Sequence, residues 1–385
     1  MELTAERIIA GGAALAREPD GRVVFVDGAL PGERVIVEIT EERRDFARAH
    51  VIATLRPSTD RIQPPCRFVA AGCGGCGWQH IAAGAQRVFK AAIVKEALTR
   101  IGGLVDPDVT DGPDLPTTGY RTTVRVAVVD GRAAFRKSAS HDLVPVDHCL
   151  VTHPLVDELL AVGRFGGASD VVLRAGVATG ERLAWLRPST GEVRLPADVA
   201  LGERATIHET VLGRTFRISA PSFFQGRLDG AAAIVEAVRE LCGPLAASDG
   251  VLVDAYAGVG VFAALLGQGR PSVLIELDRR AMGDARHNLS GRAATLVRGE
   301  VARWKPVPAE LVVADPARPG LGRKAAATLA ATRAQRIVLV SCDPASLGRD
   351  AKCLHELGYE HSRSVVIDLF SHTPHVEVVS SFAKR

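Results

Sequence analysis

The chain has 385 residues, too many for one ordinary domain, and 47% hydrophobic with 24% charged residues is the balance of a globular protein. The net charge of +3 neither supports nor excludes nucleic-acid binding, which would need local basic patches. No run of about 18 apolar residues is present, and the N-terminus lacks the features of a secretory signal, so we expect a cytoplasmic protein without membrane spans.

Residues 1–58 read as short strands joined by turns. Two runs rich in β-branched residues are separated by the Asp-Gly and Pro-Gly turns of "VDGALPGE", and "DFARAHVIATLRP" supplies another. Several short strands in such a length predict a small β-barrel. Arg43, Arg44 and Arg48 surround Phe46, which suits a nucleic-acid backbone and one stacked base. On charge alone, a solvated basic loop is the simpler interpretation.

A linker rich in proline and serine leads to a glycine-rich loop with three cysteines. Cys66, Cys73 and Cys76 form a C-x6-C-x2-C pattern, and the glycines beside them let the chain wrap closely around an inorganic centre. A fourth ligand is needed, and Cys149 is the best-placed candidate. Four thiolates can bind zinc or an iron–sulfur cluster, and spacing alone does not separate these. Reduced core cysteines are the less favoured interpretation.

The segment that follows has helical periodicity. Apolar residues from Phe89 to Ile101 recur at helical spacing, and two glycines end the run, so we predict an amphipathic helix over 84–102. From about residue 120 the pattern returns to strands. Residues 59–220 are therefore expected to form a β-rich central domain, with the alternative that the helix packs on the domain that follows.

Strands and helices alternate over residues 221–385. The apolar runs are "VLVDAYAGVG", "PSVLIELD", "ELVVADPARPG" and "RIVLVSCDP". Such alternation predicts an α/β fold with a doubly wound, mostly parallel sheet. The tail has two strand-like runs with only a loop between them, which predicts a final antiparallel hairpin. Ligands of such sheets bind beyond the carboxyl ends of the strands.

Polar residues stand at several of these strand ends. The first run leads into Gly258-Val-Gly-Val-Phe-Ala263, a G-x-G-x-x-A turn, and Glu276 ends the next strand, where it can accept hydrogen bonds from ribose hydroxyls. This fits a dinucleotide or S-adenosylmethionine, and a turn without a ligand is less favoured. Asp315 and Cys342 end two later strands. Hydride transfer has no need of this thiol, whereas methyl transfer to a poorly nucleophilic carbon does.

Taken in order, these motifs resemble the RNA uracil-5-methyltransferases that act on transfer or ribosomal RNA. "GRVVFVDGALPGE" is similar to the RNA-binding β-barrel called TRAM, and "GCGGCGWQH" with Cys149 is similar to the loop of members that hold a [4Fe-4S] cluster. "SFFQ", "DAYAGVG", "DPARPG", "SCDPASLGRD" and "HTPHVEVV" follow in the family's order. The family's "YRNK" stands here as Tyr-Arg-Thr-Thr at 120–123, which leaves the RNA target open.

The resemblance implies an OB-like TRAM barrel over 1–58, a central domain with a metal cluster over 59–220, and a Rossmann-like class I methyltransferase domain over 221–385. The implied cofactors are S-adenosylmethionine and a [4Fe-4S] cluster, in preference to zinc. The implied ligands of the cluster are Cys66, Cys73, Cys76 and Cys149. The implied contacts of S-adenosylmethionine are Gln225, Tyr256, Val261, Glu276 and Asp315. We expect a monomer that acts on RNA, with 23S rRNA favoured over tRNA, and no membrane partner.

The resemblance also assigns Cys342 as the nucleophile and Glu377 as the base. Addition of the thiolate to uracil C6 makes C5 an enolate carbon that can take a methyl group, and a base must then remove the C5 proton so that the thiol is eliminated. The target base is expected to be flipped out of its stack. The alternative is a catalytically idle RNA-binding protein that keeps the barrel and cluster. Cys242 and Cys353 are predicted to fill the core.

Overall fold

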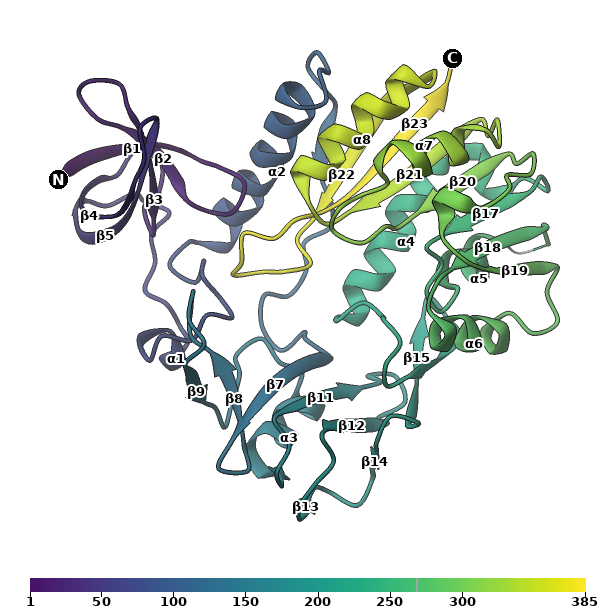
Figure 1. The fold of residues 1–385 in the computed structure, drawn as a ribbon, viewed down its shortest axis with the longest axis horizontal. Coiled ribbons are helices and arrows are strands. Elements are labelled where there is room, and N and C mark those ends of the chain that lie inside the picture. Colours follow the sequence, from purple (N-terminus) through teal and green to yellow (C-terminus); the bar gives the residue numbers. More distant parts are fainter. Residues whose placement is uncertain (268) are drawn as a thin grey trace.

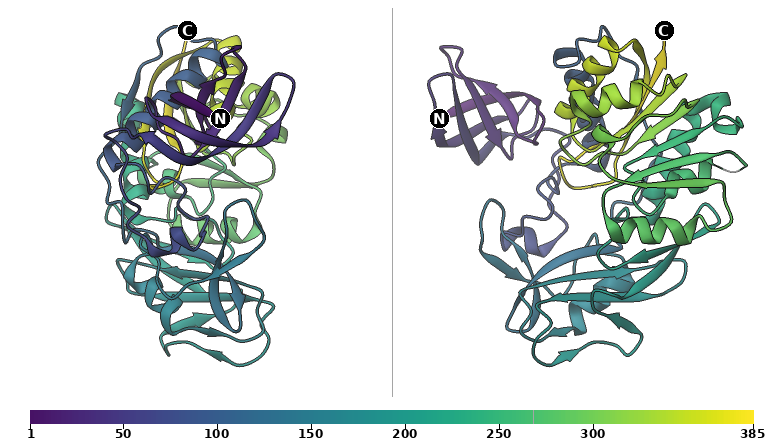
Figure 2. Two further views of the ribbon diagram at one scale, coloured as in Figure 1. Left: turned by 90° about the vertical axis from the view of Figure 1, so that its left-hand side faces the viewer. Right: turned by 45° about the vertical axis from the view of Figure 1, so that its right-hand side comes forward.

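The computed structural model describes residues 1–267 and 269–385. A small N-terminal barrel, a β-rich central part and a large sheet with helices follow one another along the chain (Figure 1). Figure 2 shows the barrel set apart from the large sheet, on the side where helix α2 (Ala83–Arg100) lies. Within the described ranges, no helix has the length and apolar character that a membrane span requires.

The N-terminal strands close into a barrel in the order β1-β2-β3-β5-β4, which confirms the predicted barrel. Its strands are β1 (Glu2–Ile8), β2 (Ala14–Arg17), β3 (Val23–Asp27), β4 (Arg34–Glu42) and β5 (Phe46–Arg56). Side chains alternate between the two faces of a strand, so Leu3 and Ala5 of β1 and Val35 and Val37 of β4 fill the interior. On the outside, Arg48 lies over the ring of Phe46, at 6.0 Å from its centroid.

The central part is built on a six-stranded sheet in the order β14-β12-β11-β7-β8-β9. Its strands are β7 (Thr123–Val129), β8 (Arg132–Arg136), β9 (Leu143–Pro145), β11 (Asp170–Ala175), β12 (Arg182–Arg187) and β14 (Val199–Leu201). Smaller elements are α1 (Arg67–Ala70), α3 (Pro154–Val162), the pair β10 (Arg164–Phe165) and β13 (Val193–Arg194), and the hairpin of β15 (Thr206–Val211) and β16 (Arg214–Ser219). Val156, Leu159 and Leu160 of α3 are buried in the core of this part.

The C-terminal part is an eight-stranded sheet in the order β19-β18-β17-β20-β21-β23-β22-β6. Its strands are β6 (Val109–Asp111), β17 (Leu252–Ala255), β18 (Ser272–Glu276), β19 (Ala294–Arg298), β20 (Leu311–Ala314), β21 (Arg336–Ser341), β22 (Tyr359–Ile367) and β23 (Glu377–Lys384). The helices are α4 (Leu228–Cys242), α5 (Val261–Leu266), α6 (Arg279–Asn288), α7 (Gly322–Ala330), α8 (Pro344–Glu356), η1 (Gly243–Ala247) and η2 (Val301–Arg303).

Helices cover both faces of this sheet, as a doubly wound fold requires. Val338 and Val340 of β21 point into the core shared with α4 and α5, whereas Ile337 and Leu339 point into the core shared with α7 and α8. Strands β17 to β21 are parallel, and β22 and β23 form the antiparallel hairpin that the sequence predicted. Cys242 is fully buried in one of these cores.

Helix α2 agrees with the helix predicted over 84–102, and it packs on the C-terminal part. It lies against α8, and Val94 and Leu98 belong to the core beneath that helix. The three-residue strand β6 pairs in parallel with β22. The segment from α2 to β6 is therefore built onto the large sheet, although it precedes the central strands in the chain.

Candidate active site

The antiparallel strand β23 brings Glu377 close to Cys342, although the two residues are 35 positions apart in the chain. Val378 of β23 pairs with Ser341, the last residue of β21. Glu377, the first residue of β23, therefore lies beside Cys342, which directly follows β21. Asp315 follows the parallel neighbour β20, so it stands at the same edge of the sheet. This edge is the carboxyl end of the parallel strands, where doubly wound folds bind their ligands.

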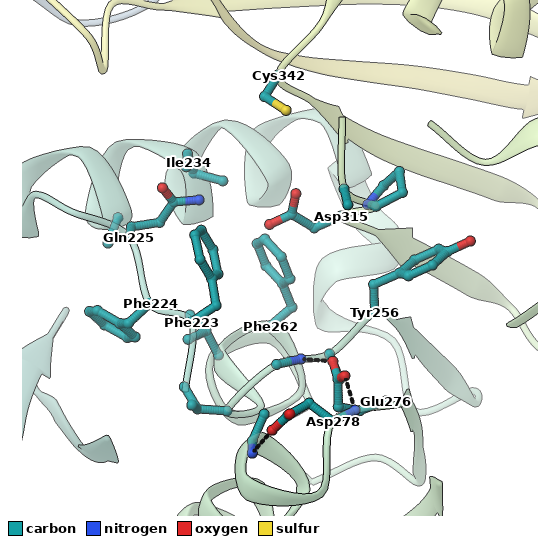
Figure 3. Close-up of a pocket in the computed structure, with 18 of the residues that line it drawn as sticks. Phe223, Phe224, Gln225, Ile234, Tyr256, Phe262, Glu276, Asp278, Asp315 and Cys342 are labelled. Atoms are coloured by element: carbon teal, nitrogen blue, oxygen red, sulfur yellow. Dashed lines mark hydrogen bonds between the residues drawn. The ribbon is translucent and has the colours of Figure 1, made fainter. Parts of the chain in front are cut away.

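A cavity of about 620 Å³ opens at this edge. It is lined by all seven residues that were predicted as catalytic or cofactor-binding, namely Gln225, Tyr256, Val261, Glu276, Asp315, Cys342 and Glu377. Figure 3 shows Cys342 at one end of the cavity and Glu276 at the other, with Asp315 between them. The fold thus gathers in one place side chains that the sequence spreads over more than 150 residues.

The loop after β17 has the backbone conformation that its glycines allow. Gly258 and Gly260 have φ angles of 53° and 86°, and Tyr256 also lies in the left-handed region with a φ of 61°. A Cβ atom on Gly260 would lie 3.1 Å from the side chain of Leu289, so a side chain there would require both the left-handed backbone and a small shift of Leu289. A non-glycine residue in this conformation is strained, which is typical of functional loops.

Glu276 is held against this loop by two backbone groups. Gly258 N donates to its Oε2 at 2.9 Å, and Asp278 N donates to its Oε1 at 2.7 Å, as the dashed lines in Figure 3 show. Asp278 in turn caps α6 by accepting from the backbone N–H groups of Arg280 and Ala281. An ionised carboxylate can accept about four hydrogen bonds, so Glu276 keeps acceptor capacity toward the cavity.

Asp254 is a residue whose role the sequence analysis missed. It is fully buried beneath the loop, and its Oδ2 accepts from Ala263 N at 2.8 Å, while Oδ1 has no partner among residues 1–267 and 269–385. The pKa of this carboxyl is raised to about 8, mainly by burial and also by the charges of Asp315 and Glu276, against the lowering effect of the hydrogen bond from Ala263 N. Asp254 therefore holds the first turn of α5 largely as a neutral acid. Its signal in the sequence was an acid at the end of the apolar run "VLVD".

The predicted nucleophile Cys342, the predicted base Glu377 and the neighbouring Asp315 all have raised pKa values. Burial raises the pKa of Glu377 well above its usual range, and the charge of Asp315 adds to this effect. Burial also raises the pKa of Asp315 to about 7. The pKa of Cys342 is raised to about 11, first by burial and then by the charges of Glu377 and Asp315, whereas Arg318 lowers it. Several ionisable groups with strongly shifted pKa values in one cavity are typical of a catalytic centre.

A second missed residue, Asp284, holds the loop at the mouth of the cavity. From inside α6 it accepts hydrogen bonds from Ser219 N at 2.9 Å, Ser219 Oγ at 2.8 Å and Ser222 Oγ at 2.6 Å. Phe223 and Gln225, which line the cavity, follow directly. Phe223 is 67% exposed despite its size. An exposed aromatic side chain in the lining of a cavity is a surface on which a base could stack.

The four cysteines predicted to bind metal line a second cavity, of about 360 Å³. They are Cys66, Cys73, Cys76 and Cys149. Burial raises the pKa of Cys73, and the charges of Cys149 and Cys66 act in the same direction. In the part of the chain that the structure describes, no three or more His, Cys, Asp or Glu side chains are placed to hold a metal ion.

Comparison with known proteins gives matches along the whole chain. Residues 4–52 match the TRAM domain family. An uncharacterized RNA methyltransferase of Streptomyces coelicolor is 37% identical over 414 aligned residues, which cover 96% of this chain and 90% of that protein. The 23S rRNA (uracil(1939)-C(5))-methyltransferase RlmD of Chromohalobacter salexigens is 30% identical, over 97% of this chain and 87% of that protein.

A solved structure has the same fold. The crystal structure of Pyrococcus abyssi tRNA (uracil-54, C5)-methyltransferase in complex with S-adenosyl-L-homocysteine matches with a TM-score of 0.76 at 23% identity, over 100% of both chains. The predicted arrangement of a TRAM barrel and a class I methyltransferase sheet is thereby confirmed. Because the relatives at 30% and 37% identity span nearly the full length, the chain belongs to the family of S-adenosylmethionine-dependent RNA uracil-5-methyltransferases.

Proposed function

We propose that the protein transfers a methyl group from S-adenosylmethionine to C5 of a uridine in RNA. The observation that carries this proposal is that Cys342 and Glu377 meet in one cavity with the glycine loop after β17. A thiol and a buried base beside each other suit covalent addition and proton removal. These intact groups favour an enzyme over a catalytically idle RNA-binding protein.

The lining of the cavity suggests how the methyl donor would be held. Glu276, fixed by the glycine loop, is suited to accept hydrogen bonds from the ribose hydroxyls. Tyr256 and Val261 flank the same loop, and Asp315 and Gln225 lie toward the thiol. We infer that the adenosine occupies the Glu276 end and that the sulfonium methyl group faces the Cys342 end. This orientation places the methyl group where the uracil must enter.

The chemistry then follows from the two residues at that end. The Cys342 thiolate forms a bond to uracil C6, and the C5–C6 electron pair moves to C5 and O4 as an enolate. C5 takes the methyl carbon as the carbon–sulfur bond of the sulfonium breaks. Glu377 removes the C5 proton, the C5–C6 double bond re-forms, and the bond from C6 to Cys342 breaks. The net change exchanges one proton for one methyl group.

The RNA is proposed to be 23S rRNA. The relative RlmD, whose name assigns it to uracil 1939 of 23S rRNA, is 30% identical in an alignment that covers 97% of this chain. The TRAM barrel, with Arg48 over Phe46 beside Arg43 and Arg44, supplies a surface suited to an RNA backbone and a stacked base. The structural neighbour from Pyrococcus abyssi acts on tRNA by its name, so tRNA is the second candidate.

We expect the purified protein to transfer a radiolabelled methyl group from S-adenosylmethionine to 23S rRNA transcribed in vitro, and not to tRNA transcripts. The product should be 5-methyluridine, identified by mass spectrometry of nuclease digests, at one position found by testing successive rRNA fragments. Exposed Lys352→Ala serves as the protein control. Label in tRNA alone would reassign the substrate, and label in neither RNA would contradict the proposed function.

We further propose that Cys66, Cys73, Cys76 and Cys149 hold a [4Fe-4S] cluster. All four thiols line one cavity, and the resemblance of the loop "GCGGCGWQH" with Cys149 to that of cluster-holding family members favours an iron–sulfur cluster over zinc. When bound, the cluster would fasten the glycine-rich loop to the central sheet at Cys149.

Anaerobically purified protein is therefore expected to be brown and to contain iron and acid-labile sulfide in equal amounts. Cys149→Ser should lose most of both, because each iron needs its own thiolate. Cys353→Ser, which removes a thiol outside this cavity, should keep them. A colourless protein that holds zinc in proportion to the chain would refute the iron–sulfur assignment.

A further inference from the structure

The buried face of α2 contains two polar side chains that the periodicity of this helix did not predict. Gln86 is 1% exposed and Lys90 is fully buried, among apolar residues such as Ile93 and Val94. Burying a charged side chain is costly unless it is paired and hydrogen-bonded. Both residues face one segment, residues 368–376, which we name the β22–β23 loop because it joins these strands.

Lys90 binds the first residues of this loop. Its Nζ donates to Asp368 Oδ1 at 2.6 Å and to the backbone oxygen of Phe370 at 3.0 Å. The other carboxylate oxygen of Asp368 accepts from Ser371 Oγ at 3.1 Å, within the same loop. The position of Phe370, whose side chain lines the active-site cavity, is thus set by a buried charge on α2.

Gln86, one turn earlier on α2, holds the middle of the loop. Its Oε1 accepts from His372 N at 2.7 Å, and its Nε2 donates to the backbone oxygens of Ile81 at 2.8 Å and Trp78 at 3.2 Å. Trp78 N donates to His372 O at 2.8 Å. His372 has a φ of 67°, a conformation that costs energy outside glycine and persists where surrounding contacts enforce it.

The β22–β23 loop leads directly into β23, which begins with Glu377. After His372 the chain passes through His375, whose ring lies 3.0 Å from Arg318 Nη2 and edge-on to Phe370, and then reaches Glu377. The residues that follow Glu377 are held by the pairing of β23 with β21. The backbone of Glu377 therefore lies between the paired strand β23 and a loop that is held by α2.

We infer that Lys90 and Gln86 are positioning residues for Glu377, acting through the β22–β23 loop, with no contact to the substrate of their own. This inference rests on the proposed function, in which Glu377 removes the C5 proton. Glu377 acts only after Cys342 has attacked and the methyl group has been transferred. A base displaced by a small distance should slow the last step and leave the earlier steps intact.

The test compares Lys90→Met with Lys95→Met, a matched substitution of an exposed lysine on the same helix that pairs with Asp106. Lys90→Met is expected to lower kcat by roughly a hundredfold, the scale expected for an angstrom-sized misplacement. It should leave the Kd for S-adenosylmethionine unchanged and accumulate a covalent protein–RNA adduct on denaturing gels. Lys95→Met should behave as wild type.

Gln86→Met provides the second variant, because it removes the hydrogen bonds from Gln86 to the loop without leaving a buried charge unpaired. It tests the inference if Lys90→Met does not fold. Full turnover in a folded variant would overturn the inference. Reduced turnover without adduct would also overturn it, because the defect would then precede the base step. Failure of the proposed function is separate, since wild-type protein would then form no 5-methyluridine.

Discussion

Replacement of Cys342 by serine is expected to abolish methyl transfer while leaving the fold and the binding of S-adenosylmethionine intact. Serine has nearly the same shape, but its hydroxyl ionises far less readily than a thiol, and the low-polarity cavity that raises the pKa of Cys342 would disfavour an alkoxide still more. Removal of a covalent nucleophile is expected to lower kcat by roughly six orders of magnitude.

The measurement is the initial rate of methyl incorporation into 23S rRNA, with Cys353→Ser as the control for loss of a thiol elsewhere. RNA that carries 5-fluorouridine gives a second readout. Fluorine cannot leave C5 as a proton would, so wild-type protein should remain bonded to this RNA through Cys342, and Cys342→Ser should form no such adduct. A serine variant that methylates uracil at the full rate would eliminate the nucleophile assignment.

The pH dependence of adduct formation checks the same residue. The pKa of Cys342 is raised to about 11, so at neutral pH the free enzyme holds the thiol mainly protonated. The thiolate fraction grows as pH rises toward that pKa, and the second-order rate of adduct formation should therefore increase steadily from pH 7 to about 9. A rate that falls over this interval would show that the attacking group is not this thiol.

Features that depend on local pattern were predictable from the sequence. Alternating apolar runs and helices gave the doubly wound sheet, and the residues at the strand ends, such as Glu276 and Asp315, face one cavity because parallel strands share an edge. Cys342 and Glu377 followed from the family resemblance. The register of β23, which sets them side by side, comes from the pairing of strands distant in the chain.

The features that escaped prediction are buried polar residues whose partners lie far away in the chain. Lys90 pairs with Asp368, and Asp284 holds Ser219 and Ser222, across separations of tens to hundreds of residues. In a sequence, an acid or lysine on a helix most often indicates a solvated face. Only tertiary contacts reveal that these charges are buried and paired, and the same contacts place α2 against the large sheet.

Substitution of Glu377 by glutamine is expected to arrest the enzyme after methyl transfer, with the RNA bonded to Cys342. Glutamine keeps the size of the side chain but cannot take up the C5 proton, so the double bond cannot re-form and the thiol cannot leave. The attack itself should not be slowed, because the charge of Glu377 contributes to the high pKa of Cys342.

The decisive readout is a protein–RNA band on a denaturing gel that carries label from the methyl group of S-adenosylmethionine, since the label shows that arrest follows transfer. Glu356→Gln, on the exposed end of α8, is the matched control and should release 5-methyluridine at the wild-type rate. Lys90→Met should give the same band more weakly, since a displaced base still acts slowly. If Glu377→Gln released methylated RNA at the wild-type rate, another group would have to remove the proton. Asp315, the neighbouring carboxyl with a pKa raised to about 7, would then be the first residue to substitute.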